Sequence, residues 1–236
     1  MKRMNEYELH AYLYSAWTAL LIPCGLTVWI FWSTLPVVLD AIHVILKVLS
    51  VVLSSAIVYA AIGFYVRELF RNTSKLIFQF PMFKEDETKM PTTEFLMWKN
   101  KQISRSQIEN VHSILCSQYN YIMFDEQKEI TDELEARRNI VGAVGIMREA
   151  TRGNKMLLQC NYRYGYQRNM LGGLVWSFVM LLISLIVNYA CALSYVTYCW
   201  VALFLVLLQG IMAFSFMKYA ARNYARTLIT TFISYS

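Results

Sequence analysis

Two long stretches of this chain contain no charged residue: Ala11–Leu39 and Met170–Met217. A hydrocarbon layer about 30 Å thick is crossed by about 20 apolar residues in a helix, and both stretches exceed that length. Their apolar residues occupy every helical face, whereas a helix of a soluble protein shows a polar side. We therefore expect membrane-spanning helices in both stretches.

Most of the charge lies between the two stretches. Of the 38 charged residues, 29 fall between Arg67 and Arg168. This distribution predicts an all-α membrane protein with two transmembrane hairpins, hence four transmembrane helices, and a mainly helical insert between the hairpins. We expect residues 1–10 to form the N-terminus, 11–66 the first two membrane helices, 67–169 the insert, 170–217 the last two membrane helices and 218–236 the tail.

The basic residues predict which side of the membrane each part occupies. Lys and Arg lie at the N-terminus, throughout the insert and in the tail, but not in the short turns that join the paired helices. Short cytoplasmic segments of membrane proteins carry an excess of Lys and Arg. Both termini and the insert are therefore expected in the cytoplasm. The net charge of +6 follows from this topology and does not by itself imply a nucleic-acid partner.

Periodicity within the insert predicts three helices. Pro91-Thr92-Thr93-Glu94 is typical of a helix start. A second helix is expected from Ser104 to Ser117, and a third from Glu126 to Ala150, where apolar residues alternate with charges at helical spacing. The segment from Lys155 to Arg168 then leads back to the membrane. Because the insert is too short for a large core of its own, we expect it to pack against the membrane helices or partner chains.

Polar residues on one face of the second membrane helix are candidates for an ion path. They are Asp40, His43, Lys47, Ser50 and Ser54. Charged groups at membrane depth are costly and often mark a path for ions or protons. Alternatively the span begins near Ile45, because residues 48–66 already give about 28 Å of helix. The charged trio would then lie at the outer interface, and the length of the span favours this second position.

A basic and aromatic set in the insert is the candidate site for a ligand. It comprises Arg137, Arg138, Arg148, Arg152, Lys155, Arg163, Tyr164 and Arg168. Guanidinium groups bind phosphates with two hydrogen bonds, and aromatic faces stack on unpaired bases. The alternative is that these residues anchor lipid headgroups, while Arg137 and Arg138 pair with acidic neighbours on a solvated helix.

No motif in the sequence indicates catalysis. The chain contains no HExxH, GxSxG, Walker A or GxGxxG pattern. The three histidines are far apart, and no CxxC pair indicates zinc or redox chemistry. We therefore expect no catalytic residue, no bound metal and no cofactor, so the chain is not expected to be an enzyme.

A set of residues between Met90 and Gly173 forms a recognisable pattern. Its members are Pro91-Thr92-Thr93, Leu96, Trp98, Arg148, Thr151-Arg152, Leu157-Leu158, Asn161, Tyr164-Gly165, Arg168-Asn169 and Gly172. This set resembles a pattern in small four-helix bacterial membrane proteins, some of which are encoded beside nucleotidyltransferases in anti-phage loci. Among these proteins, it resembles the membrane effectors of Hailong defence systems.

The resemblance implies a homotetrameric channel in the bacterial inner membrane. A partner nucleotidyltransferase would supply single-stranded oligodeoxyadenylate, or another nucleotide messenger, that binds the effector and holds it inactive. Loss of that DNA during phage attack would open the channel, depolarise the membrane and stop growth. Two alternatives to this function stay open from the residues: a non-conducting membrane anchor that docks a soluble partner, and a small transporter that uses Asp40, His43 and Lys47 as a proton relay.

Overall fold

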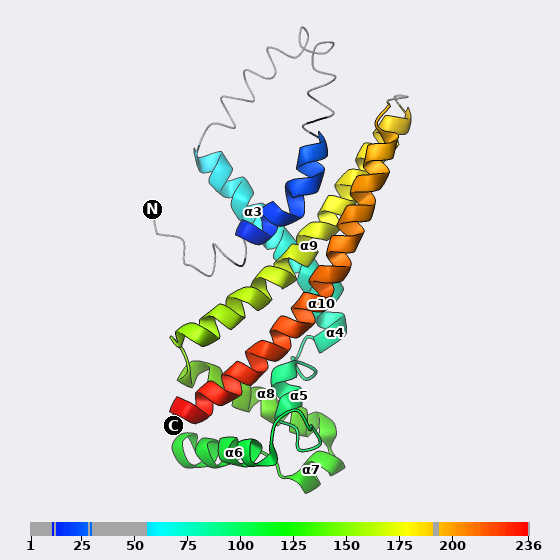
Figure 1. Cartoon of the computed structure of the whole chain (residues 1–236). Helices are drawn as coiled ribbons and strands as arrows, with labels where there is room; N and C mark the ends of the chain where they lie inside the picture. Colours follow the sequence, from blue (N-terminus) through cyan, green and yellow to red (C-terminus); the bar gives the residue numbers. More distant parts are fainter. Residues whose placement is uncertain (1–10, 12, 28, 30–55, 191–193, 236) are drawn as a thin grey trace. The chain divides into compact units, whose positions relative to one another are not determined.

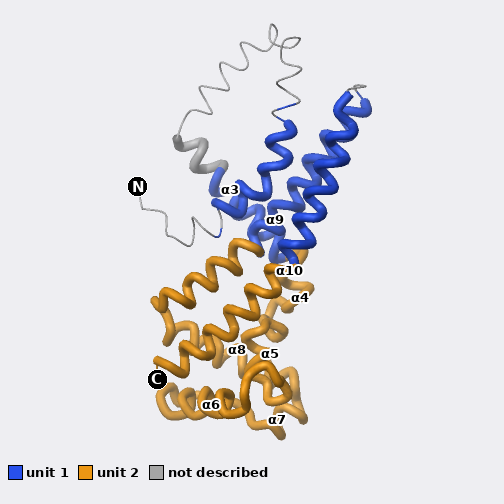
Figure 2. The backbone as a smooth tube through the Cα atoms, in the orientation of Figure 1, with its two compact units in different colours: residues 1–75, 168–214 blue, residues 76–167, 215–236 orange. Residues whose placement is uncertain are grey.

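The structure is a computed structural model that describes residues 11, 13–27, 29, 56–190 and 194–235. Helices hold 84% of this part of the chain, and it contains no strand. The predicted all-α class is therefore confirmed (Figure 1). The chain divides into two compact units (Figure 2): Met1–Lys75 with Arg168–Phe214, and Leu76–Gln167 with Ser215–Ser236. We call them unit 1 and unit 2.

Within the described part of the chain, two helices are long and apolar enough to cross a membrane: α9, Lys155–Ala190, and α10, Val196–Tyr235. Each contributes residues to both units. Both extend well beyond the predicted spans, because α9 begins at Lys155 rather than near Leu171 and α10 continues to Tyr235. The segment expected to lead back to the membrane is thus the first part of α9. Polar residues there keep the helical periodicity, and no Pro or Gly interrupts it before Gly165.

The first two predicted membrane helices are described only in part. Residues 14–27 are helical, and α3 runs Ala56–Ser74, so the helix continues past residue 66, where the second membrane helix is expected to end. The candidate ion-path residues lie outside the described residues: Asp40, His43, Lys47, Ser50 and Ser54.

Glycine allows close helix packing in unit 1. A Cβ on Gly172 would run into the carbonyl oxygen of Phe70, and one on Gly173 would lie 2.6 Å from the Cβ of Ala19. Side-chain hydrogen bonds join the same helices. Asn169 Nδ2 donates to the carbonyl of Ala11 over 2.7 Å, and Trp176 Nε1 donates to Thr73 Oγ1 over 2.9 Å. Small residues thus bring the backbones together, and polar groups link them.

Unit 2 begins with short helical segments. A π-helix, η2, spans Lys75–Gln79, and α4 spans Phe80–Phe83. The loop that follows has positive φ at Lys84 and Glu87. The helix start predicted at Pro91 is confirmed by α5, Pro91–Phe95, which ends after five residues.

The second predicted helix of the insert is confirmed. It is α6, Arg105–Tyr119, and the Ser104 side chain caps its N-terminus by accepting from Gln107 N. Asn120 ends it in the left-handed region with φ 51°. Asparagine tolerates that conformation better than most residues, so it stops the helix at little cost.

The single helix predicted from Glu126 to Ala150 is wrong, because two helices occupy that range. They are α7, Glu126–Thr131, and α8, Glu133–Ala150. The break falls at Asp132, whose backbone leaves the helical region (φ −140°, ψ 83°) and whose carboxylate accepts from Glu135 N. Asp competes with the helix by binding a nearby backbone N–H, so it favours a cap over a helix interior.

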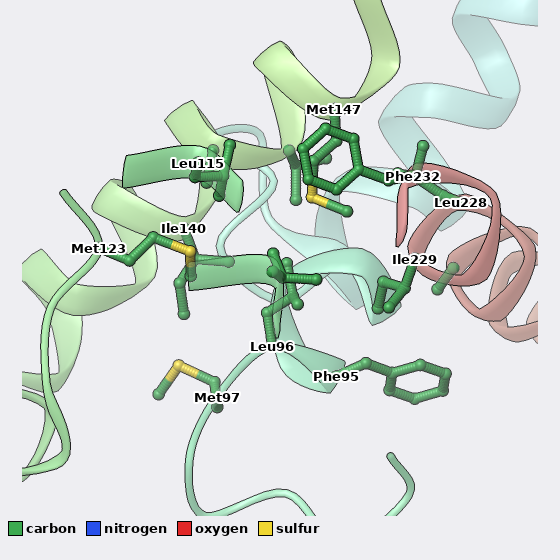
Figure 3. Close-up of a cluster of buried hydrophobic side chains, with 14 of the residues drawn as sticks. Phe95, Leu96, Met97, Leu115, Met123, Ile140, Met147, Leu228, Ile229 and Phe232 are labelled. Carbon is green, nitrogen blue, oxygen red and sulfur yellow. The ribbon is translucent and has the colours of Figure 1, made fainter. Parts of the chain in front are cut away.

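The hydrophobic core of unit 2 draws on five helices (Figure 3). From α5, α6 and α8 come residues such as Phe95, Leu115 and Met147, and α9 adds Leu157. The end of α10 supplies Ala225, Leu228, Ile229 and Phe232, all less than 2% exposed. Residues from the segment expected to form the tail, 218–236, therefore belong to the core of unit 2.

Candidate functional site

Four of the predicted ligand-binding arginines form ion pairs within unit 2. Arg137 is the most enclosed, with 16% of its side chain exposed. Its Nε donates to Glu133 Oε1 over 2.8 Å, and its Nη1 donates to the carbonyl of Thr88 over 2.7 Å. Hydrogen bonds from Lys99 and then from Arg137 lower the pKa of Glu133. Arg137 thus ties α8 to the loop before α5.

Two more of these arginines pair with acidic neighbours on their own helical segment. Arg138 Nη1 lies 3.7 Å from Glu135 Oε2, and Arg152 Nη1 lies 3.0 Å from Glu149 Oε1. Their side chains are more than half exposed. Exposed pairs of this kind contribute little to stability. An incoming phosphate would nevertheless have to compete with the carboxylate for each guanidinium.

Arg148 belongs to a group of polar side chains from three parts of unit 2. Its Nη1 lies 3.0 Å from Glu87 Oε2 in the loop before α5, and its Nε is buried with no acceptor among the described residues. Tyr224 of α10 lies beside it. Burial raises the pKa of the Tyr224 hydroxyl, and Arg148 opposes this shift. Arg148 is thus held in place by groups of its own chain.

The remaining predicted residues divide between exposed and buried positions. Lys155 and Arg163 are exposed on the first turns of α9, whereas Tyr164 is 7% exposed. Arg168 belongs to unit 1 and is 8% exposed; its Nε donates to Asn169 Oδ1 over 3.3 Å. Exposed cations and buried residues therefore share one short segment of helix.

The end of α10 carries exposed cations that the predicted ligand-binding set did not include. Asn154 Nδ2 lies 3.4 Å from the Tyr235 hydroxyl, and Cys160 Sγ lies 3.5 Å from Thr227 Oγ1. These contacts show that the start of α9 and the end of α10 pack antiparallel. Arg222 and Arg226 are exposed on that end of α10.

The sequence contains a signal that could have revealed this surface. After Glu149 the chain has no Asp or Glu, although it has seven Lys and Arg there. Sequence reasoning assigned Lys218, Arg222 and Arg226 only to topology. A basic segment without acidic residues cannot neutralise itself through neighbours on its own helix.

Sequence reasoning also missed an aromatic and cationic cluster formed by α6, the start of α7 and the loops beside them. The Trp98 ring lies 4.8 Å from the His112 ring, and the Arg105 guanidinium lies 5.3 Å from the Trp98 ring centroid. Arg105 Nη2 donates to Glu126 over 2.8 Å, and Trp98 Nε1 donates to the carbonyl of Phe124 over 3.0 Å. The Arg105–Glu126 contact joins α6 to the start of α7, so the cluster holds these two helices together.

Metal-binding groups are not found in the part of the chain that the structure describes: no three or more His, Cys, Asp or Glu side chains gather there. No protein-family model, curated protein or solved structure matches the chain.

Proposed function

We propose that this chain is a ligand-gated membrane effector of bacterial anti-phage defence. In this proposal four helices span the inner membrane, with the N-terminus, unit 2 and the C-terminus in the cytoplasm. Several copies form an ion channel whose opening depolarises the membrane. A nucleotide or single-stranded DNA oligomer, bound to unit 2, controls that opening.

The observation that carries the proposal is the uncharged apolar surface of α9 and α10. Between Met170 and Met217 no charged residue occurs, yet large side chains project outward. Ile186 of α9 is 66% exposed, and Phe204 and Ile211 of α10 are 65% and 67% exposed. Monomeric soluble proteins rarely leave a large continuous apolar surface in water. Lipid would cover these side chains, and a helix satisfies its own backbone hydrogen bonds within a bilayer.

The channel part of the proposal requires symmetric assembly of several copies. Four helices of one protomer enclose little space, so a pore requires several copies around a shared axis. We expect the second membrane helix to line it, because that helix carries Asp40, His43, Lys47, Ser50 and Ser54. The resemblance to Hailong effectors implies four copies.

Control by a ligand is supported by the two long helices. Because α9 and α10 contribute residues to both units, a ligand that shifts these helices at unit 2 acts on the same helices that carry the apolar segments. A ligand changes the open fraction only if it binds one state more tightly than the other. The resemblance implies that oligodeoxyadenylate favours the closed state.

Current recording on the purified full chain in a planar bilayer tests the proposal. We expect single-channel currents without ligand and a lower open fraction after addition of short single-stranded oligodeoxyadenylate to the side that unit 2 faces. Absence of current in both conditions would overturn the channel. Monomers without current would favour a membrane anchor instead, and substrate-coupled proton flux that is lost in Asp40→Asn would favour a transporter.

A further inference from the structure

The start of α9 runs beside the end of α10 in unit 2 (Figures 1 and 2). Both segments carry exposed cations and neither contains Asp or Glu. On α9, Lys155 and Arg163 are exposed and lie on the same side of the helix, two turns apart. On α10, the exposed residues Tyr219, Arg222 and Arg226 recur at spacings of three and four. We call these five residues the basic face.

Internal contacts place the two helices that carry the basic face beside each other. Leu157 on α9 and Leu228 on α10 point into the core of unit 2. Cys160 and Thr227 face each other between the helices. The exposed positions of each helix are therefore those that face neither the core nor the neighbouring helix. The antiparallel register set by Cys160 and Thr227 puts Arg163 at the level of Tyr224 along the helix axis, between the levels of Arg222 and Arg226.

The cations of the basic face are free to bind an external anion. Within the described part of the chain, none of Lys155, Arg163, Arg222 and Arg226 forms an ion pair with a carboxylate. The Arg226 guanidinium lies 5.9 Å from the Phe95 ring centroid, a contact that leaves its hydrogen-bond donors available. The predicted site differs, because Arg137, Arg138, Arg148 and Arg152 are each bound to a carboxylate of the same chain.

Distance along the helices favours a water-soluble polyanion over lipid headgroups. The headgroup layer adds only about 5–8 Å on each side of the hydrocarbon. Lys155 precedes Met170 by 15 residues, a rise of about 22 Å. Arg226 follows Met217 by nine residues, a rise of about 13 Å. A strip of cations that begins near the headgroups and continues beyond them fits a chain of phosphates.

We propose that the basic face binds the phosphate backbone of the single-stranded oligonucleotide, with Tyr219, 67% exposed, as a platform on which a base stacks. The proposal rests on the function proposed above and replaces the ion-paired arginines with the free ones as the ligand-binding site. Four phosphates neutralised on a single strand give a slope of log affinity against log salt of about −2.8.

Fluorescence anisotropy with a labelled oligodeoxyadenylate about 12 nucleotides long tests this site on the full chain in detergent. In Arg163→Gln/Arg222→Gln/Arg226→Gln, removal of three phosphate contacts should weaken binding about 100-fold at about 0.1 M salt and flatten the slope to about −0.7. The Arg→Lys triple variant should keep the steep slope. Lys84→Gln/Lys89→Gln/Lys101→Gln, with the same charge change on exposed loop positions, should bind like the unaltered chain.

The outcomes separate this inference from the proposed function. If the unaltered chain does not bind the oligonucleotide, the ligand class of the proposed function is wrong. If the unaltered chain binds and the Arg→Gln triple variant binds equally well, with an unchanged thermal unfolding midpoint, the basic face is not the site. Loss of phosphatidylglycerol binding in that variant, with oligonucleotide affinity unchanged, would assign the face to lipid headgroups and overturn the inference.

Discussion

His112 of α6 is a residue of unit 2 whose surroundings disfavour protonation. Its ring lies 4.8 Å from the Trp98 ring, and its Nε2 is buried without a hydrogen-bond partner among the described residues. Burial lowers the pKa of His112 below its ordinary value of 6.5, and the nearby Glu109 carboxylate opposes that shift. The neutral imidazole therefore belongs to the folded state.

This shift predicts that acid destabilises the packing around Trp98. Because the pKa is lower in the folded state, the unfolded chain binds more protons just below pH 6.5, so stability falls as the pH decreases from there through the folded pKa. His112→Gln cannot titrate. Its thermal unfolding midpoint should therefore fall less between about pH 7 and about pH 5.5 than that of the unaltered chain. Parallel pH profiles for the two proteins would refute this prediction.

Glu129 should be a strong stabilising residue although it is acidic. It is 5% exposed, and its two carboxylate oxygens accept the backbone N–H groups of Trp98 and Lys99 over 2.9 and 3.1 Å. Glu129→Ala removes both acceptors and should cost about 2 kcal/mol of unfolding free energy. The exposed Glu135→Ala should cost under about 1 kcal/mol. Thermal or denaturant unfolding of the two variants compares them, and equal costs would contradict the assignment.

Single residues could be predicted from sequence only where their partners are near in the chain. Pairs such as Arg137–Glu133 and Arg138–Glu135 follow from helical spacing, and sequence reasoning left them open as an alternative to phosphate binding. The Arg148–Glu87 pair joins α8 to a distant loop, so no periodicity indicates it. Whether an arginine is available to a ligand or held in an ion pair therefore depends in part on contacts with residues distant in the chain.

At the scale of elements, packing in unit 1 should depend on Gly172. A Cβ there would meet the carbonyl oxygen of Phe70, and a backbone atom cannot move aside as a flexible side chain can. Gly172→Ala should therefore destabilise the protein by about 1–3 kcal/mol, as overpacking does. A Cβ on Gly145 of α8 would meet no atom within 4 Å. Gly145→Ala should stabilise by about 0.5–1 kcal/mol because Ala is the better helix former.

Opposite signs for the two glycine variants are the result to expect in thermal unfolding of the full chain. Destabilisation by both would mean that α8 does not tolerate a methyl group at Gly145. A neutral Gly172→Ala would mean that the α3 and α9 backbones are not in contact at this point.

Local signals explain the elements that were predicted correctly: Ser104 caps α6 and Pro91 starts α5. Asp132 was missed because the apolar periodicity continues across the break.

For the whole molecule, charge distribution was the most informative part of the sequence. The second charge-free stretch contains the apolar parts of α9 and α10, both of which are long and apolar enough to cross a membrane. The composition of the unit 2 core was not predictable in the same way. Ala225, Leu228, Ile229 and Phe232 follow the apolar stretch of α10, and only tertiary contacts place them with Phe95. The basic face depends on the same tertiary packing.

The proposed topology makes a prediction about thiol accessibility. Cys116 is exposed on α6 in unit 2, so it should lie in the cytoplasm. A variant that keeps only Cys116, with the other four cysteines changed to Ser, should react with a membrane-impermeant maleimide in inverted inner-membrane vesicles but not in intact spheroplasts. Exposed thiols react readily once the reagent reaches them.

A second single-cysteine variant provides the matched control for this labelling. Ser194→Cys places a thiol at an exposed position just before α10, where the proposed topology puts the outer end of the last hairpin. It should react in intact spheroplasts and be protected in inverted vesicles. Labelling of both variants from the same side would contradict the proposed hairpin, because one full crossing by α10 must separate the two sites. Reversed labelling of the pair would retain the spans and invert the topology, placing the basic residues outside against the charge bias.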